Sequence, residues 1–166
     1  MRVKLLFFGV LALLVGACSP TSTGTNAPPP LDKHLLTGKW KNDSESQLVQ
    51  GYEFAEDGAL KVTILGMDAP LAGRYAWNGE RTIGMEFQLA PEVGQAYEAA
   101  AKAYKDNVMD QIKTGKLSDR AGPSILGTVH DQWPTSETLK VALSEKPPLL
   151  ILGNDAGFTQ HFNKVD

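Results

Sequence analysis

The sequence predicts a mainly β protein: an antiparallel up-and-down barrel, or a curved meander, of about eight strands with one inserted amphipathic α-helix. Three observations lead to this fold class. Apolar and polar residues alternate along much of the chain, turn-forming residues separate the alternating runs, and one stretch changes to helical spacing. Alternation with period two is typical of strands that bury one face. Successive hairpins of this kind favour a barrel or a meander.

Length, charge and cysteine content limit the possibilities further. The chain has 166 residues, which is enough for one domain with a substantial core. Its formal net charge of −3 argues against nucleic acid as a partner. Cys18 is the only cysteine, so no disulfide can form within the chain.

Residues 1–17 have the three parts of a secretory signal peptide. Arg2 and Lys4 make a positive start, an apolar run follows over residues 5–15, and two small residues precede position 18. Spanning a bilayer takes about 20 apolar residues, which is more than this run provides. A cleaved signal is therefore favoured over a retained transmembrane helix.

The junction Val15-Gly16-Ala17-Cys18 resembles the lipobox of bacterial lipoproteins. The resemblance implies cleavage before Cys18 and a diacylglyceryl group on its thiol, often with a further acyl chain on the new amine. Several chains together anchor a protein stably where one is marginal, so the lipid bilayer is an expected partner. Ser19 stands where many inner-membrane lipoproteins of enteric bacteria carry aspartate. The expected location is thus the cell envelope, at the outer membrane facing the periplasm in a Gram-negative organism.

Residues 18–30 are predicted to be the lipidated cysteine followed by a disordered tether. The segment is rich in Pro, Ser and Thr and ends in three consecutive prolines, so it cannot bury enough apolar surface to fold. The β domain is expected to occupy residues 31–166.

Between Leu36 and Leu89, strands are predicted from runs whose large apolar side chains share one parity. These side chains are Tyr52 and Phe54, then Leu60, Val62 and Ile64, then Leu71, Tyr75 and Trp77, then Ile83, Met85, Phe87 and Leu89. Polar residues take the opposite parity, as expected for a sheet with one wet face. Asp57-Gly58 and Asn78-Gly79 supply turns between the runs, and the second is a strong hairpin signal.

A helix is predicted over about residues 91–114, where apolar residues recur every three or four positions. They are Val93, Tyr97, Ala100, Tyr104, Val108 and Ile112. Pro91 suits a first helical turn, and Gly115 suits the residue after the end. The segment of about 115–134 is predicted to be mostly irregular, because it contains Gly122-Pro123 and two further glycines. Three more strands follow, near Leu139–Leu143, Leu149–Leu152 and Phe158–Phe162.

The start of the domain resembles the small lipocalin-like domains of bacterial lipoproteins. The residues concerned are Leu36-Thr37-Gly38-Lys39-Trp40, Tyr52-Glu53-Phe54, Asp57-Gly58 and Gly73-Arg74-Tyr75. The piece from Gly38 to Trp40 also occurs in lipocalins, where the tryptophan packs near an arginine of the last strand. Here Lys164 stands at the corresponding end, and the helix lies within the strand series instead of after it. The resemblance covers about half of the domain and implies a lipocalin-like barrel.

No catalytic or metal-binding pattern stands out. His34, His130 and His161 are widely separated, without the spacing that places two ligands on one face. Ser124 and Ser136 lie near His130 in sequence, but neither sits in a Gly-x-Ser-x-Gly elbow. A hydrolase is therefore the least favoured function, and no metal or cofactor is expected.

The candidate ligand-binding residues share the inward parity of the strands or the apolar stripe of the helix. They are Tyr52, Phe54, Tyr75, Trp77, Met85, Tyr97 and Tyr104. An eight-stranded barrel either holds a small ligand or is filled by side chains. The sequence thus predicts a membrane-anchored, non-enzymatic domain that binds a small apolar or amphipathic ligand in a cavity of a few hundred Å³, with the helix as lid or plug.

The alternative is a structural lipoprotein with a filled barrel, or one that presents a surface to an envelope protein. Interaction with an envelope protein predicts a contiguous exposed apolar patch, around Trp133, Pro134 and the Ile125-Leu126 run.

Overall fold

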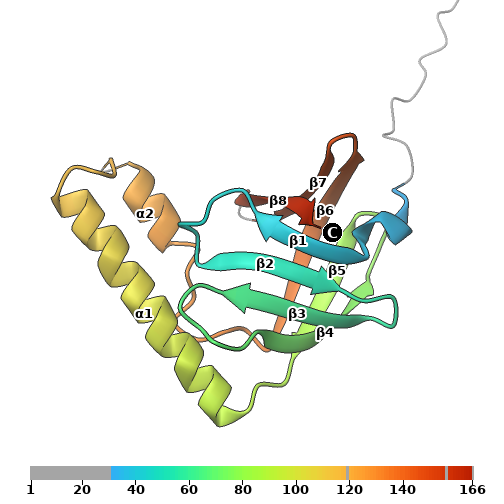
Figure 1. Cartoon of the computed structure of the whole chain (residues 1–166), viewed down its shortest axis with the longest axis horizontal. Coiled ribbons are helices and arrows are strands. Elements are labelled where there is room, and N and C mark those ends of the chain that lie inside the picture. The colour runs from blue at the N-terminus through green and yellow to red at the C-terminus, as the bar shows by residue number, and fades with distance from the viewer. Residues whose placement is uncertain (1–30, 119, 156, 166) are drawn as a thin grey trace, which may run out of the picture.

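The computed structural model describes residues 31–118, 120–155 and 157–165. They form a closed barrel of eight strands, each antiparallel to its neighbours in chain order, with the last strand paired to the first (Figure 1). The closed barrel is therefore confirmed over the open meander, as is the long helix between the fifth and sixth strands. The predicted leader, Cys18 and the tether lie outside the described residues.

Two helices separate the first five strands of the barrel from the last three. In chain order they are η1 (Lys33–Leu36), β1 (Gly38–Asn42), β2 (Val49–Phe54), β3 (Ala59–Ile64), β4 (Leu71–Trp77), β5 (Thr82–Phe87), α1 (Pro91–Lys113), α2 (Ala121–Leu126), β6 (Ser136–Glu145), β7 (Pro148–Gly153) and β8 (Thr159–Val165).

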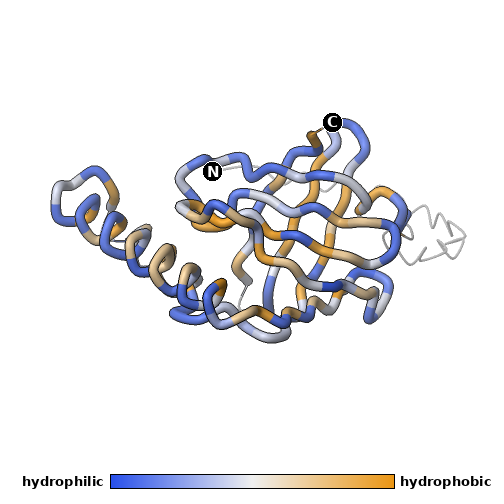
Figure 2. The backbone as a smooth tube through the Cα atoms, turned by 60° about the horizontal axis from the view of Figure 1, so that its bottom comes forward, coloured by the Kyte–Doolittle hydropathy of each residue, from blue (hydrophilic) through white to orange (hydrophobic). Residues whose placement is uncertain are grey.

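The barrel interior is filled by the side chains whose parity predicted it. Leu60, Val62 and Ile64 of β3 are buried, whereas Lys61 and Thr63 between them are exposed. Phe162 of the last strand is also fully buried. Figure 2 shows the same pattern, with hydrophobic residues along the strands and hydrophilic ones in the loops and at the far end of α1.

The two predicted turns both form, with different backbones. Gly58 adopts a φ of +82°, which a glycine tolerates at no steric cost. The β4–β5 hairpin closes through a hydrogen bond from Asn78 N to Thr82 O at 2.9 Å, so its loop is longer than two residues. Gly79 consequently does not need a positive φ, contrary to the simplest two-residue turn.

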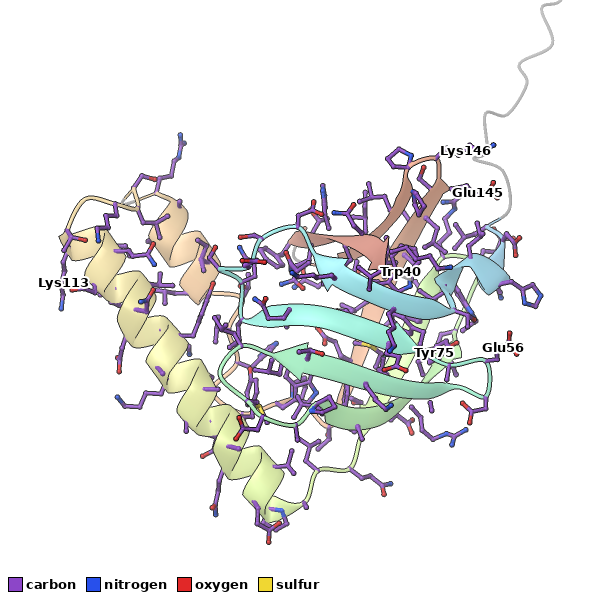
Figure 3. The ribbon with its side chains drawn as sticks, viewed as in Figure 1. Trp40, Glu56, Tyr75, Lys113, Glu145 and Lys146 are labelled. Atoms are coloured by element: carbon purple, nitrogen blue, oxygen red, sulfur yellow. The ribbon has the colours of Figure 1, made fainter. Side chains whose placement is uncertain are left out.

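One end of the barrel is closed by η1, a short helix that alternation along the strands does not reveal. The Asp32 side chain accepts a hydrogen bond from His34 N and so caps its start. Leu36 at its end is fully buried, and its carbonyl accepts the indole N–H of Trp40 at 2.7 Å. Figure 3 shows Trp40 and Tyr75 on the side of the barrel that faces η1. We call this the η1 end.

α1 covers the opposite end, at which β2 begins and β3 ends (Figure 1). Its buried residues include Tyr97, Tyr104 and Val108, which is the predicted stripe. The segment that contains α1 and α2 begins after β5 and ends before β6. Its two ends lie side by side, because Phe87 N at the end of β5 donates to Thr135 O, just before β6, at 2.8 Å. The insertion therefore leaves the pairing of β5 with β6 uninterrupted. We call this the α1 end.

The segment after α1 contains the short helix α2, where the sequence was expected to be mostly irregular. The Gly122-Pro123 pair indicates a break, yet proline is acceptable in a first helical turn because its missing N–H would be unpaired there anyway. Gly122 is buried against Ile112 of α1, and a Cβ at this position would overlap the Ile112 side chain. The glycine thus permits a close approach of the two helices. Within the described residues, no helix is long and apolar enough to cross a membrane.

Candidate ligand-binding site

A pocket of about 110 Å³ lies at the α1 end of the barrel. Its walls come from β2, β6, β7, α1 and the segments that precede β6 and β8. We call it the mouth pocket; its lining includes the aromatic Tyr52, Tyr97, Tyr104 and Trp133, the ionisable His130 and Glu137, and the neutral polar Gln47, Thr128, Asn154 and Gln160. It is smaller than the few hundred Å³ expected from the sequence, because side chains fill the barrel below it.

Tyr52 separates the mouth pocket from the filled core. Its ring stacks on Phe54 with 5.6 Å between centroids and meets Phe162 edge-on at 5.1 Å. The side chain is only 5% exposed. Burial raises the pKa of Tyr52, and the nearby Glu137 carboxylate raises it further. The Tyr52 hydroxyl is therefore uncharged at neutral pH.

Tyr97 and Tyr104 form the helical wall of the pocket. They are seven residues apart, which places both on one face of α1. The Tyr97 hydroxyl donates to the His130 carbonyl at 3.1 Å and so ties α1 to the loop before β6. Burial, followed by the charges of Glu137 and Asp131, raises the pKa of Tyr97 to about 12. This wall too is neutral at physiological pH.

Glu137 places a half-buried carboxyl in the pocket from the second position of β6. It faces Met85 of β5 in the sheet register, on the same parity as the buried Leu139 and Val141. Burial raises the pKa of Glu137, and the charge of His130 partly opposes this shift. Among the described residues that line the pocket, Glu137 is the only carboxylate and none is Lys or Arg.

Trp133 lies between the mouth pocket and a more open depression of about 370 Å³ beside the start of α1. Its ring meets Phe87 and Tyr97 edge-on, with centroids 5.3 and 5.2 Å away. The indole Nε1 is buried and has no hydrogen-bond acceptor within the described part of the chain. Trp133 therefore divides two spaces and carries an unused donor.

No family model matches the chain, and no curated protein or solved structure matches it. The site must therefore be interpreted from its own residues. Within the described ranges, no three His, Cys, Asp or Glu side chains gather where they could hold a metal ion.

The structure does not bring the seven predicted ligand-binding residues into one site. Tyr52, Tyr97 and Tyr104 line the mouth pocket, whereas Phe54 and Met85 are packed in the core. The other two lie at the η1 end.

Tyr75 and Trp77 line an open depression of about 630 Å³ at that end. The Tyr75 hydroxyl donates to the Ala55 carbonyl at 2.8 Å, and the Lys33 ammonium lies 5.1 Å from the Trp77 ring centroid. Both aromatic side chains thus have structural partners there.

The mouth pocket is also lined by residues outside the predicted ligand-binding set, namely Glu137, His130 and Trp133. The sequence pattern could have indicated Glu137, because it is an acidic residue at an inward-facing position of its strand. No such pattern indicates His130 or Trp133, since both lie in a loop without periodicity. Trp133, Ile125 and Leu126 were expected to form an exposed patch under the alternative function; they are half-buried and pack against the core.

Proposed function

We propose that this protein is a lipid-anchored envelope protein whose barrel binds a small amphipathic molecule in the mouth pocket. The observation that carries the proposal is the combination of aromatic rings with polar side chains, among them Glu137, Asn154 and Gln160, at the covered end of the barrel. Such a mixture is typical of small-molecule sites, in which apolar walls give affinity and a few polar groups fix orientation.

The volume of the pocket limits the ligand. A cavity of about 110 Å³ is somewhat smaller than engineered apolar cavities of about 150 Å³ that bind benzene. The bound portion is therefore no larger than about one six-membered ring. A longer ligand would have to leave part of its structure outside the pocket.

The ligand proposal is tested by native mass spectrometry of the full-length protein purified from its own cells. We expect a small molecule retained by the wild type and lost in Tyr104→Trp, whose larger side chain would occupy the pocket. Tyr104→Phe serves as the control, because it keeps the ring and the space. A wild-type protein that is always empty, and that binds none of a panel of small amphipathic compounds, would contradict the proposal.

The anchoring proposal is supported by the lipobox-like junction before Cys18 and is tested separately. Cys18→Ser should give a protein that carries no lipid and keeps its leader, seen as slower migration and the absence of radiolabelled fatty acid. Unchanged mature protein in the membrane fraction would contradict anchoring through this residue. Neither outcome bears on the pocket.

A role in presenting a surface to an envelope protein is the second candidate, because the barrel interior is filled. The surface would lie along α1, where Met109 is 41% exposed. Met109→Glu places a charge on this surface; if it abolishes chemical cross-linking of the protein to an envelope protein in cells while ligand retention persists, this candidate is favoured.

A further inference from the structure

The mouth pocket has aromatic rings on several sides. Tyr52 comes from β2, Tyr97 and Tyr104 from α1, Trp133 from the loop before β6, and Phe158 from the segment before β8. The face of an aromatic ring carries the negative part of its quadrupole and attracts a cation within about 6 Å of the ring centre. Rings from four different elements thus surround one small space.

Among the described residues that line this space, Glu137 is the only acidic one and His130 the only basic one. Glu137 is half-buried, and within the described part of the chain none of the ion pairs includes it. The nearest basic lining group is His130, while Lys105 of α1 is already paired with Asp131 at 2.8 Å. A carboxylate that is removed from water costs free energy unless a positive partner accompanies it. A positively charged ligand beside Glu137 would offset that cost.

The remaining walls determine which cation fits. Leu48, Val129 and Leu152 line the pocket along with the aromatic rings, and only one carboxylate is present. The neutral polar side chains Gln47, Asn154 and Gln160 also line the space. A bare divalent metal ion is normally held by several strong ligands, and within the described residues no three His, Cys, Asp or Glu side chains gather here. An alkylated ammonium is weakly hydrated and packs its methyl groups on apolar and aromatic surface.

We propose that the mouth pocket binds a small organic cation, such as a methylated ammonium group, between the tyrosine and tryptophan rings and the carboxylate of Glu137. This inference rests on the proposed function, because it names the ligand class of the same pocket. The size of the space restricts the cation to a head group of a few heavy atoms; any longer chain extends outside.

The test compares choline with its uncharged carbon isostere, in which a tert-butyl group replaces the trimethylammonium group. Binding of each probe to the full-length protein is measured by calorimetry and by shifts of the tyrosine proton resonances. We expect choline to bind at least about tenfold more tightly than the isostere, because only the cation gains the aromatic and carboxylate attraction.

Variants of the lining residues test whether they cause the difference in affinity between choline and its isostere. Glu137→Gln should weaken choline by about tenfold or more and leave the isostere unchanged. Glu86→Gln is the matched control, since Glu86 is an exposed carboxylate on β5 outside the pocket, and it should change neither affinity. Tyr104→Leu removes a lining ring and should weaken choline binding roughly tenfold. Thermal unfolding of each variant verifies that it is folded.

The outcomes separate the two proposals. If the isostere binds as tightly as choline and Glu137→Gln has no effect, the cation assignment is overturned while the small-ligand function stands. If neither probe binds at millimolar concentration, the cation assignment is also overturned, and the mass spectrometry above decides the small-ligand function. Selective choline binding that depends on Glu137 supports both.

Discussion

The Lys164 ammonium lies 5.4 Å from the centroid of the Trp40 ring, directly across the seam where the last strand closes on the first. Trp40 is 2% exposed, and Lys164 also approaches the Leu35 carbonyl at 3.5 Å. The lysine therefore covers the tryptophan at the η1 end. This is the end at which the sequence resemblance placed Trp40 and Lys164.

Replacing Lys164 by Met should lower the free energy of unfolding by about 0.5–1 kcal/mol, because the stem is kept while the cation–π attraction is lost. Urea unfolding measures the change. Lys39→Met makes the same chemical change on the exposed side of β1 and should stay within about 0.5 kcal/mol of wild type. Equal losses in the two variants would mean that the Trp40 contact contributes nothing.

Gly38→Ala should destabilise the protein by roughly 1–3 kcal/mol, because Gly38 has a φ of +127° that an L side chain rarely adopts. A Cβ there would also lie 2.9 Å from Lys164 Cε, a flexible atom that can move. The loss should therefore persist in a Lys164→Ala background. Gly94→Ala in α1, where a Cβ meets nothing within 4 Å, should instead stabilise by about 0.5–1 kcal/mol. If the Gly38→Ala loss vanished with Lys164, side-chain crowding and not backbone strain would be its cause.

Glu137→Gln should raise the melting temperature at pH 7 and leave it nearly unchanged at about pH 4. Burial raises the folded-state pKa of Glu137, so the folded protein holds this proton more tightly than the unfolded chain. The resulting stabilisation is complete below the unfolded pKa and is lost as the pH rises through the folded pKa. The groups that face Glu137 are His130, whose charge acts in the opposite sense, and Tyr52 and Tyr97, which stay neutral.

The measurement is the melting-temperature difference between variant and wild type across this pH range. Glu86→Gln on β5 controls for the loss of one exposed carboxylate and should show no such trend. A Glu137→Gln protein that is less stable than wild type at neutral pH would show that the ionised carboxylate makes a favourable interaction in the folded state.

Trp133→Phe should change the free energy of unfolding by less than about 1 kcal/mol, since it removes a buried donor that has no acceptor among the described residues while keeping a ring against Phe87 and Tyr97. Trp133→Ala should cost about 3 kcal/mol, because it removes the ring and joins the two spaces beside it. Chemical denaturation distinguishes the two. A large loss in Trp133→Phe would indicate that the indole N–H has a partner such as a bound water.

Much of the fold follows from periodicity. Leu60, Val62 and Ile64 predict the inner face of β3, and the change to helical spacing places α1 within one residue at its C-terminal end. The short helices η1 and α2 are too brief for a periodic signal, and Gly122-Pro123 favours a break there. Their formation depends on packing against the barrel and α1, which no local pattern contains.

The candidate site is less predictable for a geometric reason. Parity states which face of a strand a side chain occupies but not its depth along the barrel axis. Tyr52 and Tyr75 both have the inward parity, yet they lie at opposite ends. The contact between Tyr97 and His130 joins residues 33 positions apart, so it depends on the path of the loop.

The hydrogen bond from Phe87 to Thr135 brings together the two ends of the segment 88–134, which covers the α1 end of the barrel. Everything between these two residues leaves and re-enters the barrel at one pair of adjacent strand ends, so the insertion does not interrupt the pairing of β5 with β6. The strands supply Tyr52 and Glu137 to the pocket, and the chain between β5 and β6 supplies Tyr97, Tyr104 and Trp133. The last three residues take no part in strand pairing, so the covering wall of the pocket and the register of the barrel are specified by different parts of the chain.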